Sequence, residues 1–160
     1  MCLSVYSAYA SQICKDVIIA TSPDSSFIIH NDGTVTQKTT GLMWMRCDLG
    51  QKWDGASCTE AASFFTWNEA LNKADLEKFA GYTDWRLPNK NELESIVEER
   101  CVLPAVNTGV FPATPTEFHW TSTPYVGLGT GVWSVGFSYA VVTATEKSGK
   151  IHVRLVRDAD

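Results

Sequence analysis

The chain has 160 residues, of which 44% are hydrophobic and 19% are charged, so a single domain can bury well over half of its unfolded surface. Eleven glycines and six tryptophans favour a loop-rich α+β or mainly β fold over a helix bundle. The net charge is -5 and the 13 lysines and arginines are scattered, which argues against nucleic acid as a partner. No stretch approaches the ~18 consecutive apolar residues of a membrane span, so we expect none.

The first ten residues end in Ala8-Tyr9-Ala10, which has the small-x-small form of an export-signal cleavage site, although they lack a basic start. They are interpreted as the remnant of an export signal, with added cloning sequence or an ordinary N-terminal strand or coil as the alternatives. We divide the chain into an N-terminal segment, residues 1–26, and a domain, residues 27–160. Cys2 is then the odd thiol.

A β-hairpin opens the domain. Two β-prone runs, residues 27–30 and 34–36, flank Asn31-Asp32-Gly33, and Asp-Gly between such runs is a strong hairpin signal because both turn positions favour positive φ. A short apolar strand, residues 42–45, follows.

Two amphipathic helices are predicted in mid-chain. Thr66 and Glu69 have the spacing of a capping box, and the apolar residues behind them form one face of a helix that ends near Gly81. Asn89 caps a second helix, whose apolar face extends to Cys101. Prolines then exclude long regular structure over residues 101–115. Short runs at residues 119–121, 132–137, 140–144 and 151–156 predict a C-terminal antiparallel meander.

The five cysteines lack the short paired spacings of a zinc site and have no histidine at ligand spacing. Cys47 and Cys58 flank a polar, turn-rich segment that a local disulfide would close. Cys14 precedes the first strand and Cys101 lies on a predicted helix face, so we pair these two as a long-range disulfide, with buried free thiols as the alternative. Each closure contributes roughly 3 to 5 kcal/mol in the chain-entropy model, and two disulfides indicate an oxidising compartment.

Five ordered blocks of sequence carry a family resemblance. They are residues 31–36 (NDGTVT), 40–44 (TGLMW), 81–89 (GYTDWRLPN), 120–125 (WTSTPY) and 152–157 (HVRLVR). Over roughly residues 27–157 the chain resembles the Lcl C-terminal domain family, first named from a bacterial collagen-like adhesin. The block at residues 85–93 is also similar to the formylglycine-generating-enzyme type of C-type-lectin-like fold.

The resemblance implies an α+β, C-type-lectin-like domain of an exported bacterial protein that is periplasmic, on the cell surface or secreted. It implies a non-enzymatic, adhesin-like module that recognises a glycan or a protein. A structural or assembly subunit of a bacterial surface machine is the alternative. A formylglycine-generating type of oxidase comes third, because such enzymes use a late cysteine pair and no cysteine follows Cys101. Collagen-like stalks are three-stranded, so the resemblance also implies a homo-oligomer, first of all a trimer.

Several eye-catching side chains have a structural interpretation. We expect Trp44, Trp85 and Trp120 in the core. For Trp133, a core position and a ligand-binding surface position are both open. A structural ion pair, backbone clamp or helix cap is expected for five polar residues: Asp84, Arg86, Asn89, Arg154 and Arg157.

No metal or cofactor is expected. The three histidines, His30, His119 and His152, lie far apart, and the Glu-Pro-Asn, Gln-Pro-Asp and Trp-Asn-Asp tripeptides of calcium-dependent lectins are absent from the sequence. No nucleophile elbow or phosphate-binding glycine loop occurs, which argues against an enzyme.

The ligand-binding surface is expected in the late loops, because variable members of the C-type-lectin-like fold use the corresponding segments. These are residues 124–132 and 138–140, with 147–150 as a weaker candidate. In such segments rigid aromatics supply contact area and glycines let the backbone adapt. The alternative is ordinary turns whose tyrosines cap the edge of the core. The predicted ligand-binding residues are Tyr125, Gly127, Trp133, Ser138 and Tyr139.

Overall fold

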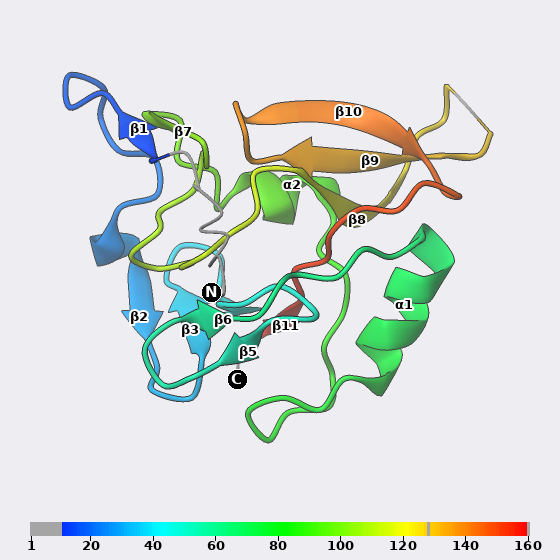
Figure 1. Ribbon diagram of the computed structural model, residues 1–160, viewed down its shortest axis with the longest axis horizontal. Coiled ribbons are helices and arrows are strands. Elements are labelled where there is room, and N and C mark those ends of the chain that lie inside the picture. The colour runs from blue at the N-terminus through cyan, green and yellow to red at the C-terminus, as the bar shows by residue number, and fades with distance from the viewer. Residues whose placement is uncertain (1–10, 128, 160) are drawn as a thin grey trace, which may run out of the picture.

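A computed structural model describes residues 11–127 and 129–159 of the chain (Figure 1). The predicted α+β class is confirmed, because antiparallel strands carry most of the regular structure and two short helices accompany them. The assignment to the C-type-lectin-like fold stays a prediction. The helices are α1 (Trp67–Leu76), α2 (Lys90–Glu94) and the 3-10 turn η1 (Asp24–Ser26). The strands are β1 (Ile13–Cys14), β2 (Phe27–Ile29), β3 (Thr34–Gln37), β4 (Leu42–Met45), β5 (Lys52–Trp53), β6 (Cys58–Thr59), β7 (Cys101–Val102), β8 (Phe118–Pro124), β9 (Gly131–Gly136), β10 (Val141–Glu146) and β11 (Val156–Asp158).

The first sheet has the strand order β11-β4-β3-β2 and contains the predicted hairpin. Ile29 pairs with Val35 next to the turn. The Asp32 carboxylate accepts hydrogen bonds from the Thr34 amide (3.0 Å) and hydroxyl (2.7 Å), and Gly33 adopts a φ of 87°, which few side chains tolerate. The hairpin prediction is therefore confirmed.

The second sheet, β10-β9-β8, is the predicted meander, but it has three strands and not four. His152 only bridges His119 of β8, in parallel, and β11 then pairs with β4 in the first sheet, with Val156 opposite Trp44. The prediction of a fourth meander strand is wrong because alternating apolar residues identify a strand without naming its partner. Here Val153 and Leu155 are fully buried against the first sheet's residues Met43 and Met45.

Both helices begin where the sequence predicts. At α1 the Thr66 hydroxyl accepts from the Glu69 amide (3.3 Å), and the Glu69 carboxylate accepts from the Thr66 amide (2.8 Å). Asn89 and Glu92 form the same reciprocal box at α2. The predicted end of the first helix near Gly81 is wrong by several residues, since α1 stops at Leu76.

The second helix is also shorter than predicted, and Cys101 is not on it. The Ser95 hydroxyl donates to the Glu92 carbonyl (2.6 Å), which competes with helix continuation. Val97 then forms a bridge with Val106, so the chain becomes extended. Cys101 therefore lies in β7, opposite Cys14 of β1.

Two apolar clusters fill the interior, and β4 lies between them. Leu42 and Trp44 belong to one cluster, whereas Met43 and Met45 point into the other. Because both of its faces are covered, all four residues of β4 are buried. The prediction of core positions for Trp44, Trp85 and Trp120 is confirmed, since at most 2% of each side chain is exposed.

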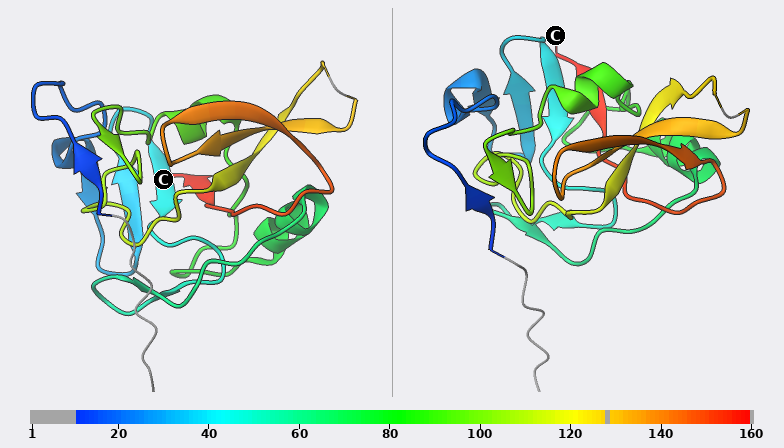
Figure 2. Two further views of the ribbon diagram at one scale, coloured as in Figure 1. Left: turned by 45° about the horizontal axis from the view of Figure 1, so that its top comes forward. Right: turned by 90° about the horizontal axis from the view of Figure 1, so that it is seen from above.

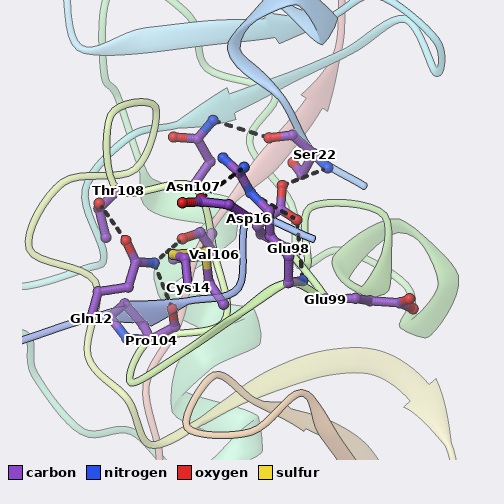
Figure 3. The surroundings of a disulfide bond; sticks show 12 residues. Gln12, Cys14, Asp16, Ser22, Glu98, Glu99, Pro104, Val106, Asn107 and Thr108 are labelled. Carbon is purple, nitrogen blue, oxygen red and sulfur yellow. Dashed lines mark hydrogen bonds and ion pairs between the residues drawn. A yellow bond between two sulfur atoms is a disulfide. The ribbon is translucent and has the colours of Figure 1, made fainter. Parts of the chain in front are cut away.

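Both predicted disulfides are present. Cys47–Cys58 closes a local loop, and Cys14–Cys101 joins residues 87 apart in sequence. Figure 3 shows the second disulfide among side chains that hold the N-terminal segment on the domain. The Gln12 amide donates to the carbonyls of Pro104 and Val106, at 2.7 Å each.

A buried carboxylate completes this attachment. Glu98 is 2% exposed and accepts from the amides of Thr21 (3.1 Å) and Ser22 (3.0 Å).

The division of the chain at residues 26 and 27 stays a prediction. The proposed export-signal remnant, residues 1–10 with Cys2, lies outside the described residues.

Candidate ligand-binding surface

The five predicted ligand-binding residues fall at two ends of the second sheet. Tyr125 and Gly127 lie in the connection from β8 to β9, next to Trp133 on β9, whereas Ser138 and Tyr139 form the turn from β9 to β10. Trp133 lies three residues before the end of β9, roughly 10 Å at about 3.3 Å per residue, and Tyr139 lies in the turn beyond that end. The fold therefore does not gather them into one site. Figure 2 shows the β8–β9 end projecting from the body of the molecule.

The first group is a small aromatic cluster with one cation, which we call the Trp133 patch: Tyr125, Trp133 and Lys90. The Tyr125 ring meets the Trp133 ring edge-on, with 4.8 Å between centroids and an interplanar angle of 76°. The Lys90 ammonium lies 5.6 Å from the Trp133 ring centroid and 2.7 Å from the Glu94 carboxylate. All three side chains of the patch are half-buried.

Lys90 is the member that reasoning from the sequence missed. It lies at the start of α2, more than forty residues from Trp133. The strand pattern of the meander contains no signal that α2 packs on β9. A capped helix ahead of the meander offers only the general expectation that some helical side chain covers the sheet.

An irregularity in β8 positions the patch. The register of β8 against β9 shifts between Trp120 and Pro124. Within this shift the Thr121 hydroxyl donates to the Trp133 carbonyl (2.6 Å), and the Thr123 hydroxyl accepts from the Lys90 amide (2.9 Å). These two threonines tie the patch's tryptophan and lysine to the same short stretch of β8.

Gly127 contributes through its lack of a side chain. A Cβ at this position would lie 2.5 Å from the Tyr125 hydroxyl oxygen. Glycine therefore lets the Tyr125 ring fold back against its own loop. This contact explains the residue type at position 127 without reference to a ligand.

The second group, the Tyr139 turn (Ser138–Tyr139), is an exposed ring on an anchored backbone. The Ser138 carbonyl accepts from the Leu103 amide (2.9 Å), and Ala140 adopts a φ of 56°. The Tyr139 side chain is 61% exposed. The ring is therefore presented to solvent, and the β9–β10 turn that carries it lies at the end of the sheet opposite the β8–β9 connection (Figure 1).

The ion pairs of Arg86 and Arg157 have the structural role that the sequence predicts. Arg86 binds both carboxylate oxygens of Glu92 (2.8 and 3.0 Å) and one oxygen of Asp158 (2.9 Å). Arg157 donates to Asp84 (2.8 Å), and this hydrogen bond lowers the Asp84 pKa. Both pairs join the C-terminal strand to the segment around α2.

The most buried charges form what we call the Asp48 cluster: Asp48, His119 and Arg154. Arg154 Nε lies 2.8 Å from one Asp48 oxygen and His119 Nε2 lies 3.0 Å from the other, and all three side chains are fully buried. Burial acts to raise the Asp48 pKa, but Arg154 and His119 hold it well below its usual range. The cluster joins β8 to the C-terminal segment and lies out of reach of solvent.

Within residues 11–127 and 129–159, no group of three or more His, Cys, Asp or Glu side chains is arranged to hold a metal ion. No helix in these ranges is long and apolar enough to cross a membrane.

A model of the Lcl C-terminal domain family matches residues 33–157. The chain therefore belongs to the Lcl C-terminal domain family. The match begins at the hairpin turn, ends on β11, and includes both the Trp133 patch and the Tyr139 turn. A search of curated proteins finds no match to the chain. Family membership is consistent with a surface-associated module, and together with the two disulfides it suggests an exported or extracellular protein.

Proposed function

We propose that this protein is a non-enzymatic, surface-associated module that recognises a glycan or a protein on a cell surface through the Trp133 patch. The observation that carries the proposal is the pairing of two half-buried aromatic rings with a positioned ammonium group at the projecting end of a sheet. The compartment, whether periplasm, cell surface or medium, belongs to the same proposal.

The patch is suited to binding because little of its conformational freedom remains to be lost. Trp133 is held by Tyr125, and Lys90 is held by Glu94 through a 2.7 Å ion pair. Aromatic side chains offer a large contact area with only two rotatable bonds, so they lose little entropy on binding. Such residues supply a large share of the binding energy at recognition surfaces.

The Asp48 cluster supports a non-enzymatic role. Its acid, imidazole and guanidinium are the types of group that catalytic sites use, but here the Asp48 carboxylate is bound by His119 and Arg154 in the interior. Groups that are engaged with one another and closed to solvent stabilise a fold without meeting a substrate.

A structural subunit is the second candidate. Val17 and Ile19, which lie in the N-terminal segment close to the Cys14 disulfide, are 94% and 89% exposed. Exposed apolar side chains that lie close together mark contact surfaces in many proteins. Assembly through this segment agrees with the expected homo-oligomer, for which a trimer is the first prediction.

A binding screen on the purified chain tests the proposal. We expect a hit on a glycan array or a panel of host surface proteins, and we expect Lys90→Gln to weaken that binding severalfold. Lys73→Gln, an exposed lysine on α1, is the matched control and should bind normally. A protein that binds nothing in either panel and buries Val17 and Ile19 between subunits would instead support the assembly role.

A further inference from the structure

A cavity of about 320 Å³ opens beside the Cys47–Cys58 loop and shares no residue with the Trp133 patch. This volume lies at the lower end of the range of about 300 to 1,000 Å³ in which small-molecule sites fall. The cavity can therefore take one small molecule and not a chain of several units. Its walls come from Met45, Cys47, Asp48, Leu49, Gly50, Gln51, Lys52, Trp53, Glu77 and Phe79, although the Asp48 side chain itself is not exposed.

The aromatic wall of the cavity is built by three segments that are distant in sequence. A Cβ at Gly33 would lie 2.7 Å from Trp53 Cγ and 2.9 Å from Phe79 Cζ, so the hairpin turn presses against both rings. The Trp53 indole also donates to the Asn31 carbonyl (3.2 Å). The hairpin turn thus fixes the positions of Trp53 and Phe79.

Arg46 covers the Trp53 ring from another direction. Its guanidinium lies 4.4 Å from the ring centroid. The same group donates to the carbonyls of Val110 (2.7 Å) and Gly109 (3.0 Å), and the residue is buried. A positive charge therefore already makes a cation–π contact with one face of this ring.

The rim of the cavity carries one carboxylate that is free to accept hydrogen bonds. Gln51 is engaged on both sides, because it accepts from the Asp48 amide and donates to the Ala113 carbonyl. Lys52 is paired with Glu60 at 2.7 Å. Glu77 is half-buried, and within the described ranges no group donates a hydrogen bond to its side chain.

The charges around the cavity select the ligand. The Arg46 guanidinium repels a cation that Glu77 would attract, and the Glu77 carboxylate repels an anion that Arg46 would attract, so the site favours neither sign of net charge. A neutral molecule with an apolar face can pack on Trp53 and Phe79, and its hydroxyl groups can donate hydrogen bonds to Glu77. We propose that this cavity binds a single neutral sugar ring, as a site separate from the Trp133 patch.

The test is a titration of the complete chain with neutral methyl glycosides (glucose, galactose, mannose, fucose and N-acetylglucosamine), followed by tryptophan fluorescence and NMR. At least one sugar should bind in the millimolar range, and glucuronate and methylammonium should bind more weakly. Glu77→Gln should weaken sugar binding about tenfold, because a charge-assisted hydrogen bond is lost. Glu99→Gln, an exposed carboxylate beside the N-terminal segment, should bind as the unmodified chain does (Figure 3).

Three outcomes overturn the inference: no binding of any neutral glycoside by the folded protein, a preference for glucuronate or methylammonium, or unchanged affinity in both Glu77→Gln and Trp53→Phe. Phenylalanine is chosen at position 53 because it removes the indole but keeps an aromatic ring in the wall, so the loop should stay folded. Loss of sugar binding in Tyr125→Ala but not in Glu77→Gln would assign the sugar to the Trp133 patch. That result would support the proposed function and reject this cavity as its site.

Discussion

The Asp48 cluster and the Trp133 patch use the same two strands in opposite ways. His119 of the cluster is on β8, where it pairs with Val135 of β9, and Trp133 lies two residues before Val135. In the cluster, charged groups face one another with no exposure to solvent. In the patch, an aromatic pair and an ammonium group remain half-exposed.

This difference separates stability from recognition along a single β-hairpin. A buried ion pair contributes little net free energy, but removing one partner leaves an uncompensated charge in the interior and is strongly destabilising. Side chains that face solvent affect the free energy of unfolding far less. Residues at the projecting end can therefore change with the ligand while the buried end holds the sheet in place.

The largest effect is expected from Asp48→Asn. The variant leaves the Arg154 guanidinium buried without its carboxylate partner, which should lower the free energy of unfolding by about 3 to 5 kcal/mol. Urea denaturation followed by tryptophan fluorescence measures this loss. Asp75→Asn, an exposed position on α1, is the control and should stay within about 0.5 kcal/mol. A loss below about 1 kcal/mol in Asp48→Asn would mean that the cluster does not hold the sheet.

Removal of the long-range disulfide is also expected to lower the free energy of unfolding strongly. The double variant Cys14→Ser, Cys101→Ser opens a loop of 87 residues in sequence and should cost roughly 3 to 5 kcal/mol, because the unfolded chain regains freedom. Thermal denaturation measures the loss. Mass spectrometry of a non-reduced tryptic digest provides the independent check, and recovery of Cys14 as a free thiol in the unmodified protein would contradict the pairing.

Acid should weaken the protein through His152 before it weakens the Asp48 cluster. Burial and the neighbouring His119 lower the pKa of His152, so below about pH 6.5 the unfolded state takes up the proton first. The free energy of unfolding should then fall with pH from about 6.5 toward the folded pKa, by at most about 1.4 kcal/mol per pH unit. Urea denaturation between about pH 7.5 and 5 measures this slope.

His152→Gln should flatten that slope, and an equally steep profile in the variant would contradict the assignment. The Asp48 pKa is also lowered, but its contribution is present above about pH 3.9 and disappears only as the pH falls further. The two groups therefore act in separate pH ranges, and the variant distinguishes them.

Local sequence signals predicted the parts of the fold that depend on a few neighbouring residues. The two capping boxes, at Thr66 and at Asn89, and the Asp32–Gly33 turn are each set by hydrogen bonds or dihedral angles within four residues. The partner of Val156 on β11 depends on contacts more than a hundred residues away, so the periodicity of the strand could not reveal it.

The candidate sites show the same limit. Tyr125 and Trp133 could be found because they lie within one hairpin, but Lys90 joins them only through the packing of α2. The cavity depends on Gly33, Trp53 and Glu77, which come from three segments with no common motif. Sequence reasoning also grouped Tyr139 with Tyr125, because variable members of the C-type-lectin-like fold use both late loops, but that resemblance does not give the distance between the two loops.

Tyr125→Ala should lower both the stability of the hairpin and its affinity for the ligand. Its edge-on contact with Trp133 contributes about 0.5 to 1.5 kcal/mol to stability beyond its buried area. If the patch binds the ligand, the free energy of binding should also weaken, by about 1 to 2 kcal/mol, which is about a tenfold loss of affinity. Calorimetry of binding and of unfolding on the same sample measures both losses. Normal affinity together with lower stability would make Tyr125 a core residue.

The smallest effect on stability is expected from Tyr139→Ala. The ring is 61% exposed, so the free energy of unfolding should change by less than about 0.5 kcal/mol. Because Tyr139 lies in the turn beyond the end of β9, roughly 10 Å or more from Trp133, a compact ligand at the patch should bind this variant normally. A ligand long enough to reach both ends should lose affinity in Tyr139→Ala and in Tyr125→Ala alike. Loss of binding in Tyr139→Ala alone would move the recognition surface to the β9–β10 turn, because a stable fold with an intact Trp133 patch would then have failed to bind.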